Sequence, residues 1–306
     1  MDRHLLAAIA SDPLRAMATT GRVLAALATL DAKWQITVDG VRAFEATSST
    51  VFDGTLPDET PVWIYLSVTD AQQNWARALW SKLTLVHSAM PNSQNQIPKP
   101  IVSSPDYEVM VLAVRTSRQS ISSARAAMWY ADFSKSHEKW EAMDRGHWIE
   151  RAEGAALCVP APLRPIAARI LQKLKQLGRK LDQKNWRVSL PHGAFIAGNF
   201  WGDGECAMSL PIAESDYQPV YKDISDFLLG YRAESEKRFG VSQQAYADFT
   251  AKLGLNQDEE NGFLPFFLGC ETLWQIANTS ISDVQLARTQ DQLEQLFQDL
   301  RPISKA

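Results

Sequence analysis

The strongest constraint on the fold is the separation of strand-forming and helix-forming segments along the chain. Residues 34–66 are rich in Val, Thr, Ile and Phe and are punctuated by the turn pairs Asp39-Gly40, Asp53-Gly54 and Pro57-Asp58. This composition is typical of a small antiparallel sheet of three or more strands. Beyond Arg118 nearly every segment has helical periodicity. Because strands and helices occupy separate parts of the chain, the pattern predicts an α+β protein.

The strand-rich part contains a clear hairpin pattern. The stretch TVFDGTLPDETPVWIYLS predicts a strand ending at Leu56, a turn at 57–60 and an apolar strand at 61–67. A helix is predicted from Ala71 to His87, because large apolar residues recur there at helical spacing. Two further strands are predicted in IPKPIVSS and YEVMVLAV, and the second is apolar enough to lie inside the sheet.

Helices are predicted at both ends of the chain. Pro13 separates two Ala- and Leu-rich helices within residues 3–30. The helix at 163–185 has an apolar residue every third or fourth position, which predicts one buried face. Ser282 is expected to cap the last helix. The helices after Arg118 are predicted at 120–132, 136–145, 163–185, 223–238, 242–253, 262–278 and 283–300.

Composition excludes several classes of protein. A net charge of −4 argues against nucleic-acid binding, which usually needs a basic field. The three cysteines, Cys158, Cys206 and Cys270, form no CxxC pair, so neither a disulfide framework nor a zinc site is expected. The N-terminus lacks a signal-peptide pattern, and no apolar run approaches the roughly 18 residues of a membrane span. We therefore expect a cytoplasmic protein without membrane contact.

One stretch combines the residues of a catalytic loop with those of a hairpin. SLPHGAFIAGNFWGDGECAMSLP, residues 189–211, contains His192-Gly193, Asn199 and an Asp203-Gly204 turn. Together with Asp223 it resembles the catalytic segment of the aminoglycoside phosphotransferase-like family, which includes choline and other small-molecule kinases. The hairpin at 50–67 and the stretch IPKPIVSSPDYEVMVLAV resemble strands of that family's nucleotide lobe. The resemblance implies a two-lobed protein-kinase-like fold, with a sheet-rich small lobe at 1–116 and a helical large lobe at 117–306.

The resemblance also implies which residues should carry phosphoryl transfer, and most of them are replaced. Such kinases use a carboxylate as base, an Asn and an Asp on magnesium, and a strand lysine held by a helix glutamate. Asn199 matches, but Ala194 stands at the base position and Pro211 at that of the metal-binding Asp. Tyr65 stands at or next to the lysine position, and only Ala78 or Leu79 is available where the glutamate would lie. The phosphate loop, EATSSTVF, has no glycine.

These replacements predict a pseudokinase that acts by binding. No catalytic residue is expected, and His192, Ala194, Asn199 and Pro211 are interpreted as the remnants of the motif. His192 is expected to be structural. Tyr65 and Asn199 are expected to lie in a degenerate nucleotide cleft without a metal site. Its ligand would be a small molecule or a nucleotide in the cleft, or else a protein partner.

Two alternatives remain open. The first is an active, divergent ATP-dependent phosphotransferase acting on a small hydroxyl compound. ATP and magnesium are expected as cofactors only in that case, with Glu214 or Asp216 replacing the missing metal ligand. The second is an α+β interaction protein of unrelated fold. Trp63 and Tyr65, interpreted as lying on opposite faces of their strand, are the bulky residues expected to fill a closed cleft.

Overall fold

The structure is a computed structural model that describes most of the chain beyond residue 34. The described ranges are 35–42, 50–89, 97–114, 121–142, 145–182, 184–193, 195–202, 207–209, 217–231 and 236–300, with positions 25 and 28. The chain divides into two compact units. Unit 1 comprises Met1–Ser120, His192–Ala194 and Asn199–Ser215, and unit 2 comprises Ile121–Pro191, Phe195–Gly198 and Asp216–Ala306. The helices predicted within 3–30 lie outside the described residues, apart from these two positions.

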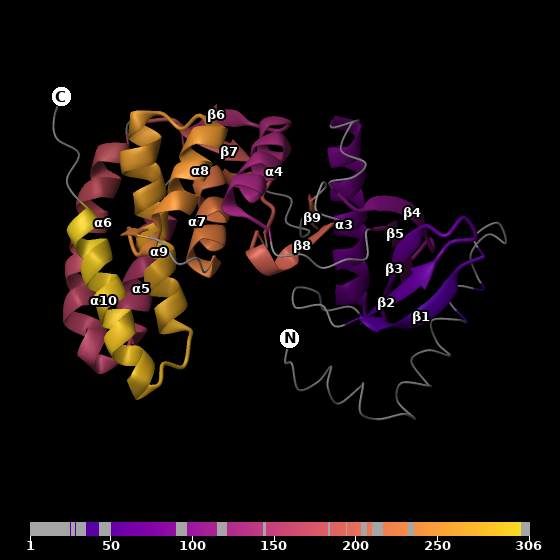
Figure 1. The fold of residues 1–306 in the computed structure, drawn as a ribbon, viewed down its shortest axis with the longest axis horizontal. Helices are drawn as coiled ribbons and strands as arrows, with labels where there is room; N and C mark the ends of the chain where they lie inside the picture. The colour runs from indigo at the N-terminus through magenta and orange to yellow at the C-terminus, as the bar shows by residue number, and fades with distance from the viewer. Residues whose placement is uncertain are drawn as a thin grey trace. The chain divides into compact units, whose positions relative to one another are not determined.

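Unit 1 is built on an antiparallel five-stranded sheet with the order β1-β2-β3-β5-β4 (Figure 1). One helix, α3 (Asp70–Ala89), follows the third strand. The hairpin, the helix and the two later strands all agree with the sequence prediction, and β5 is paired on both sides. The strands are β1 (Thr37–Arg42), β2 (Thr50–Thr55), β3 (Pro61–Leu66), β4 (Lys99–Ser103) and β5 (Val109–Ala113).

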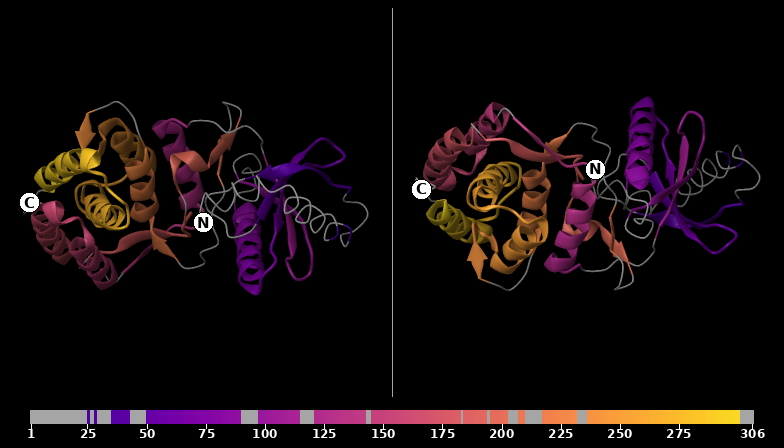
Figure 2. Two further views of the ribbon diagram at one scale, coloured as in Figure 1. Left: turned by 90° about the horizontal axis from the view of Figure 1, so that it is seen from below. Right: turned by 90° about the horizontal axis from the view of Figure 1, so that it is seen from above.

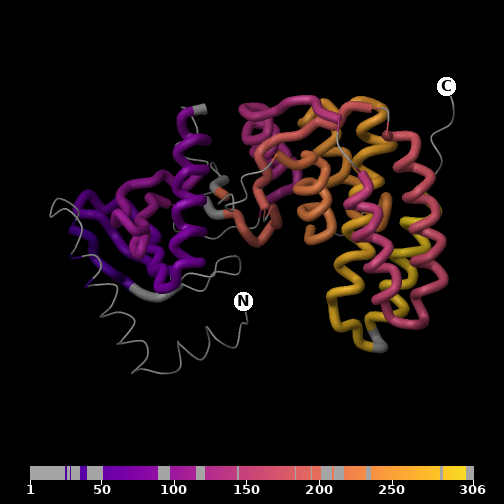
Figure 3. The backbone as a smooth tube through the Cα atoms, turned by 180° about the vertical axis from the view of Figure 1, so that it is seen from behind, coloured from indigo at the N-terminus to yellow at the C-terminus, as the bar shows by residue number. Residues whose placement is uncertain are grey.

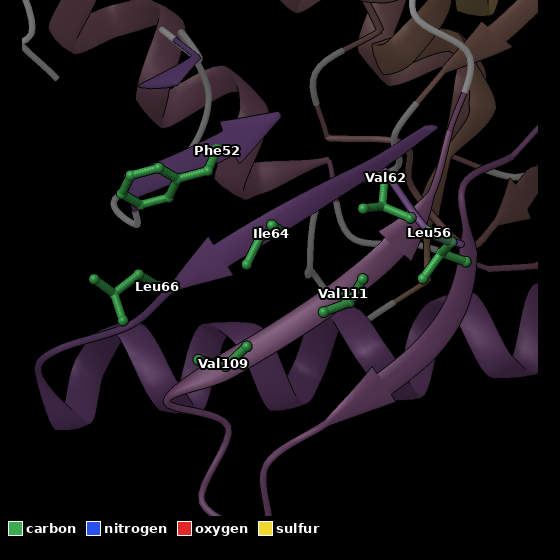
Figure 4. Close-up of a cluster of buried hydrophobic side chains, with 7 residues drawn as sticks. All are labelled: Phe52, Leu56, Val62, Ile64, Leu66, Val109 and Val111. Carbon is green, nitrogen blue, oxygen red and sulfur yellow. The ribbon is translucent and has the colours of Figure 1, made fainter. Parts of the chain in front are cut away.

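Apolar side chains, all aliphatic except Phe52, cover one face of this sheet. The cluster consists of Phe52, Leu56, Val62, Ile64, Leu66, Val109 and Val111. Figure 4 shows these side chains on the strands, with α3 running behind them. Alternation along β3 places Val62, Ile64 and Leu66 in this cluster and therefore directs Trp63 and Tyr65 to the opposite face. The interpretation that Trp63 and Tyr65 lie on opposite faces is wrong, because residues two apart in a regular strand share a face.

Unit 2 is mainly helical. A small sheet with the order β10-β7-β6 and a two-stranded hairpin, β11-β12, interrupt the helices. The helices are α4 (Ser123–Lys135), α5 (Gly146–Cys158), η2 (Ala161–Leu163), α6 (Arg164–Leu181), α7 (Val220–Gly230), α8 (Gln243–Leu253), the π-turn η4 (Glu259–Phe263), α9 (Leu264–Ala277) and α10 (Asp283–Asp299). The strands are β6 (Lys139–Glu141), β7 (Trp186–Ser189), β10 (Gln218–Pro219), β11 (Lys237–Arg238) and β12 (Val241–Ser242).

Helix α6 organises the packing of unit 2. Its stripe of Ile166, Ile170, Leu174, Leu177 and Leu181 is buried, as the spacing predicts. Figures 2 and 3 show α10 beside α6. The guanidinium carbon of Arg169 on α6 lies 4.0 Å from the centroid of the Phe297 ring on α10. On α9, a Cβ built on Gly269 would lie 2.5 Å from a Leu174 methyl carbon, so any larger residue there would force Leu174 to move.

Two predicted helices differ from the structure. Part of the segment expected to be helical at 136–145 is strand β6, which pairs with β7 far away in the sequence. The helix expected at 223–238 ends at Gly230, and Lys237–Arg238 forms a strand instead. In both cases a long-range or hairpin pairing overrides local periodicity. Ser282 and Gln285 form the predicted cap of α10 as a capping box. Among the described helices, none is long and apolar enough to span a membrane.

Candidate functional site

The predicted catalytic segment is a strand, a loop and a hairpin. Strand β7 leads into the loop that carries His192, and η3 (Ala197–Asn199) leads into strands β8 (Phe200–Gly202) and β9 (Ala207–Ser209). The two strands are antiparallel, with Phe200 opposite Ser209. Gly193 has a φ of +83°, which explains why glycine follows the histidine. The predicted hairpin is therefore confirmed, although its turn at Asp203-Gly204 lies outside the described residues.

His192 is fully buried and is held by its own hairpin. Its Nε2 lies 2.9 Å from Ser209 Oγ, and Ser209 Oγ donates a hydrogen bond to the Asn199 carbonyl at 2.7 Å. Because the single hydroxyl proton of Ser209 is used in that bond, His192 Nε2–H must be the donor to Ser209. Burial, followed by the positive charge of Lys82, lowers the pKa of His192 well below its ordinary value of 6.5. His192 is thus a neutral imidazole that fixes the loop to the hairpin.

Asn199 is brought next to His192 through this hydrogen-bond chain. Its side chain is buried, and its amide oxygen is chemically able to bind a metal ion. A magnesium site would need carboxylate ligands beside it. Among the described residues, however, no group of three or more His, Cys, Asp and Glu side chains is placed to hold a metal ion. Pro211, Glu214 and Asp216 lie outside the described residues.

Tyr65 occupies an aromatic environment. It lies on β3, is fully buried, and points from the face of the sheet opposite the apolar cluster. Its ring lies 5.8 Å from that of Trp75 on α3, at an interplanar angle of 37°. Trp63 shares this face and is also fully buried. Where the resemblance implies an ion pair between strand and helix, the described contact is therefore between two aromatic rings.

Lys82 is a buried cation that the sequence analysis missed. It lies on α3 in the same stripe as Trp75, Leu79 and Val86, which helical spacing places on one face. Its charge acts on the imidazole of His192, so the two groups are electrostatic neighbours within unit 1. Leu79, at the position considered for the glutamate, is fully buried. A lysine inside an apolar stripe, where burial is rare, is the sequence signal that could have found Lys82.

Asp223 has a structural role in unit 2, where it lies in the first turn of α7. The Tyr130 hydroxyl lies 3.1 Å from Asp223 Oδ2 and 3.2 Å from the Val220 carbonyl. Burial and then the charge of Asp223 raise the pKa of Tyr130 well above its ordinary value, so the phenol remains a donor. Asp223 therefore ties the start of α7 to α4.

The structure thus joins His192 to Asn199 through Ser209 and packs Tyr65 against Trp75, and Ala194 lies outside the described residues. Among the described residues of unit 1, strand β3 carries a buried phenol and no lysine, and no acidic cluster suited to magnesium is found.

Comparison with solved structures identifies the fold. A choline/ethanolamine kinase family protein from Mesorhizobium loti matches 92% of this chain and 93% of its own, with 14% identity and a TM-score of 0.53. An aminoglycoside phosphotransferase from Alicyclobacillus acidocaldarius matches 90% and 93%, with 14% identity and a TM-score of 0.54. The amicoumacin kinase hAmiN, in complex with AMP-PNP, Ca²⁺ and Ami, matches 88% and 90%, with 13% identity and a TM-score of 0.53.

The chain has the fold of these small-molecule kinases. This agrees with the predicted kinase-like α+β architecture, and the alternative of an unrelated α+β fold is wrong. No protein-family model matches the sequence, and no curated protein matches it either. At 14% identity or less the likeness concerns the fold, so the chemistry has to be argued from the residues themselves.

Proposed function

We propose that this protein is a pseudokinase, with the fold of a small-molecule phosphotransferase but without its reaction, and that it acts in the cytoplasm by binding. The observation that carries the proposal is the contact between Tyr65 and Trp75. In a working kinase a lysine at this position grips the phosphates of the nucleotide. A buried phenol packed on an indole supplies no positive charge for that purpose.

The neighbouring groups support the same proposal. His192 is neutral and uses its Nε2–H on Ser209, so it is committed to the architecture of the hairpin. Ala194 has no proton acceptor and Pro211 has no side-chain ligand for a metal. Loss of a general base alone costs a factor of roughly 10²–10⁴ in rate. Loss of the cation and metal ligand also removes the electrostatic stabilisation on which phosphoryl transfer mainly depends.

The bound partner would be a small molecule or a nucleotide held without turnover, or another protein. A nucleotide is a reasonable first candidate, because hAmiN, which shares the fold, binds AMP-PNP. Binding that needs no magnesium would fit a site from which the metal ligands have been lost.

Thermal-shift measurements on the full chain test this proposal. ATP and ADP are added separately, each with and without magnesium, and the melting temperature is recorded. We expect magnesium to make no difference to any nucleotide effect. A magnesium-dependent rise in the melting temperature, accompanied by release of γ-phosphate, would contradict the proposal.

A specific observation favours the second candidate, an active divergent phosphotransferase. Lys82 provides a buried cation next to His192, and a lysine on the helix could take over the role of the missing strand lysine. In that case Lys82→Met would abolish turnover of ATP. Lys252→Met on α8, where the lysine is exposed, would leave it unchanged. If neither variant changes a measured turnover, that turnover does not come from Lys82 and this candidate loses its support.

Restoring the missing groups tests whether a nucleotide site is still present in outline. The triple variant Tyr65→Lys, Ala194→Asp and Pro211→Asp would supply the lysine, the base and the metal ligand together. After circular dichroism has shown that the variant is folded, the same thermal-shift series is repeated. We expect no magnesium-dependent nucleotide effect, because the aromatic surroundings of position 65 are unchanged.

A further inference from the structure

Unit 2 contains a cavity of about 350 Å³ that the catalytic segment does not explain. Its walls are the end of α7, the β11-β12 hairpin, the end of α9 and the first turns of α10, all within the helical unit. A volume of this size is at the lower end of the range for small-molecule sites, roughly 300–1,000 Å³. The cavity is therefore large enough for one compact ligand.

The open side of the cavity carries positive charge. Lys237 of the hairpin and Arg288 of α10 both line it, and both are exposed. No aspartate or glutamate is among the described residues that line the cavity. Within the described part of the chain, neither cation takes part in an ion pair. Two available cations without a neighbouring carboxylate in the lining favour an anionic ligand.

The walls offer hydroxyl oxygens as hydrogen-bond acceptors. Thr272, Thr279 and Thr289 line the cavity, and each donates its proton to the backbone carbonyl four residues earlier, at 2.6, 2.7 and 2.9 Å respectively. A hydroxyl whose proton is already used can still accept a hydrogen bond through its oxygen. These three oxygens therefore suit a ligand that brings hydrogen-bond donors of its own, such as alcohol groups.

Part of the inner surface is apolar, and its hairpin wall is held in a fixed conformation. Leu228, Val241 and Ile276 are buried lining residues that can contact the carbon skeleton of a ligand. The hairpin turns at Phe239-Gly240, where both residues have positive φ, +52° and +79°. The amide of Phe239 donates to the Asp299 carboxylate of α10 at 2.7 Å. A positive φ at a phenylalanine is strained, so this bond to α10 helps to keep the wall in place.

We propose that this cavity binds a small polyhydroxylated anion, such as a sugar acid or a sugar phosphate. Lys237 and Arg288 would hold the carboxylate or phosphate group, and the threonine oxygens would accept hydrogen bonds from the ligand hydroxyls. The same charges exclude cationic amino sugars. The proposal rests on the cavity alone and does not depend on whether the protein turns over a nucleotide.

Isothermal titration of the full chain with four matched sugars tests the proposal, in low salt and without nucleotide or magnesium. The ligands are D-gluconate, D-glucose 6-phosphate, D-glucose and D-glucosamine, with inorganic phosphate as a fifth. We expect at least one of the two sugar anions to bind about tenfold or more tightly than glucose, glucosamine or phosphate. If gluconate alone binds, the anion is a carboxylate, and if glucose 6-phosphate alone binds, it is a phosphate.

Variants of the two cations that line the cavity, called the rim variants, and one control test whether the ligand binds in this cavity. Arg288→Gln and Lys237→Gln, on separate elements, should each weaken binding of the sugar anion by about fivefold to tenfold. Arg179→Gln, at an exposed arginine of α6, should leave it unchanged. The proposal is overturned if neither sugar anion binds, if glucose or phosphate binds equally well, or if both rim variants bind like the wild type. Magnesium-dependent ATP turnover, in contrast, would overturn only the proposed pseudokinase function.

Discussion

Arg187 and His192 are only five residues apart in the sequence, but the buried polar clusters that contain them differ in charge. At Arg187, in unit 2, the guanidinium Nε lies 2.9 Å from the Glu259 carboxylate, and the Tyr221 hydroxyl donates to the same carboxylate at 2.9 Å. At His192, in unit 1, the imidazole and Ser209 form a cluster that burial keeps neutral. The charged cluster holds helices and a strand together, whereas the neutral cluster lies in the segment that resembles a kinase catalytic loop.

The difference suggests a distinction between buried polar groups that stabilise a kinase-like fold and groups that serve only its reaction. Neither partner of a buried ion pair can be replaced alone without leaving the other charge buried and uncompensated, which destabilises the fold. If the proposed function is correct, Tyr65 illustrates that a group serving only the reaction can be replaced by another side chain without loss of the fold. Two exposed cations, Lys237 and Arg288, line the cavity of unit 2.

Removing the charge compensation in unit 2 should have the largest effect on stability. Glu259→Ala leaves the buried Arg187 with the more distant Glu138 carboxylate, at 3.7 Å, and we expect it to lower the free energy of unfolding by about 3–5 kcal/mol. Asp258→Ala is the matched control, because this neighbouring carboxylate pairs with Lys184 at the surface and contributes at most about 1 kcal/mol. Urea unfolding of both variants measures the difference. Equal losses would show that the Arg187–Glu259 pair is not the anchor described here.

The aromatic pair of unit 1 should come next. Tyr65→Ala removes a fully buried ring from its contact with Trp75 and is expected to cost about 3–4 kcal/mol of unfolding free energy. Tyr65→Phe keeps the ring and should cost about 1 kcal/mol or less. The comparison is made by urea unfolding. A loss in the phenylalanine variant as large as that in the alanine variant would mean that the hydroxyl, and not ring packing, fixes this position.

The neutral histidine should reveal itself through pH. The folded-state pKa of His192 lies below its ordinary value of 6.5, so below that pH the unfolded chain takes up a proton that the folded chain does not. Stability from this group is therefore complete above pH 6.5 and falls as the pH decreases, by at most about 1.4 kcal/mol per pH unit.

Unfolding measured between pH 7.5 and 5 tests that slope. His192→Gln keeps an N–H donor for Ser209 but does not titrate, so it should show a shallower decline toward pH 5. The control His147→Gln changes an exposed histidine and should decline like the wild type. A wild-type slope in His192→Gln would contradict the assignment of a buried neutral imidazole.

Much of the fold could be predicted because its signals are local. Strand β3, helix α3 and helix α6 have regular alternation or helical spacing, and their predicted bounds agree closely with the structure. Strand β6 could not be found in this way, because its three residues become a strand only by pairing with β7. The β11-β12 hairpin was missed because a turn through Phe239 lacks the usual Asn or Asp before its glycine.

The candidate site was predictable in outline and not in its contacts. The hairpin after Asn199 followed from turn chemistry, whereas the structural role of the buried His192 stays a prediction. Lys82 could not be found from the family resemblance, which implies a cation on strand β3, whereas the structure places the buried lysine on the following helix. Its nearness to His192 depends on how the loop packs, which sequence spacing does not encode.

The proposed absence of phosphoryl transfer is tested most directly by ³¹P nuclear magnetic resonance of ATP and magnesium incubated with a high concentration of the protein. The wild type, Lys82→Met and Lys252→Met are compared over many hours with a protein-free sample. The pseudokinase proposal predicts that the γ-phosphate signal decays at the protein-free rate in all three protein samples. Faster decay with the wild type and Lys252→Met that is lost in Lys82→Met would contradict it and establish an active phosphotransferase.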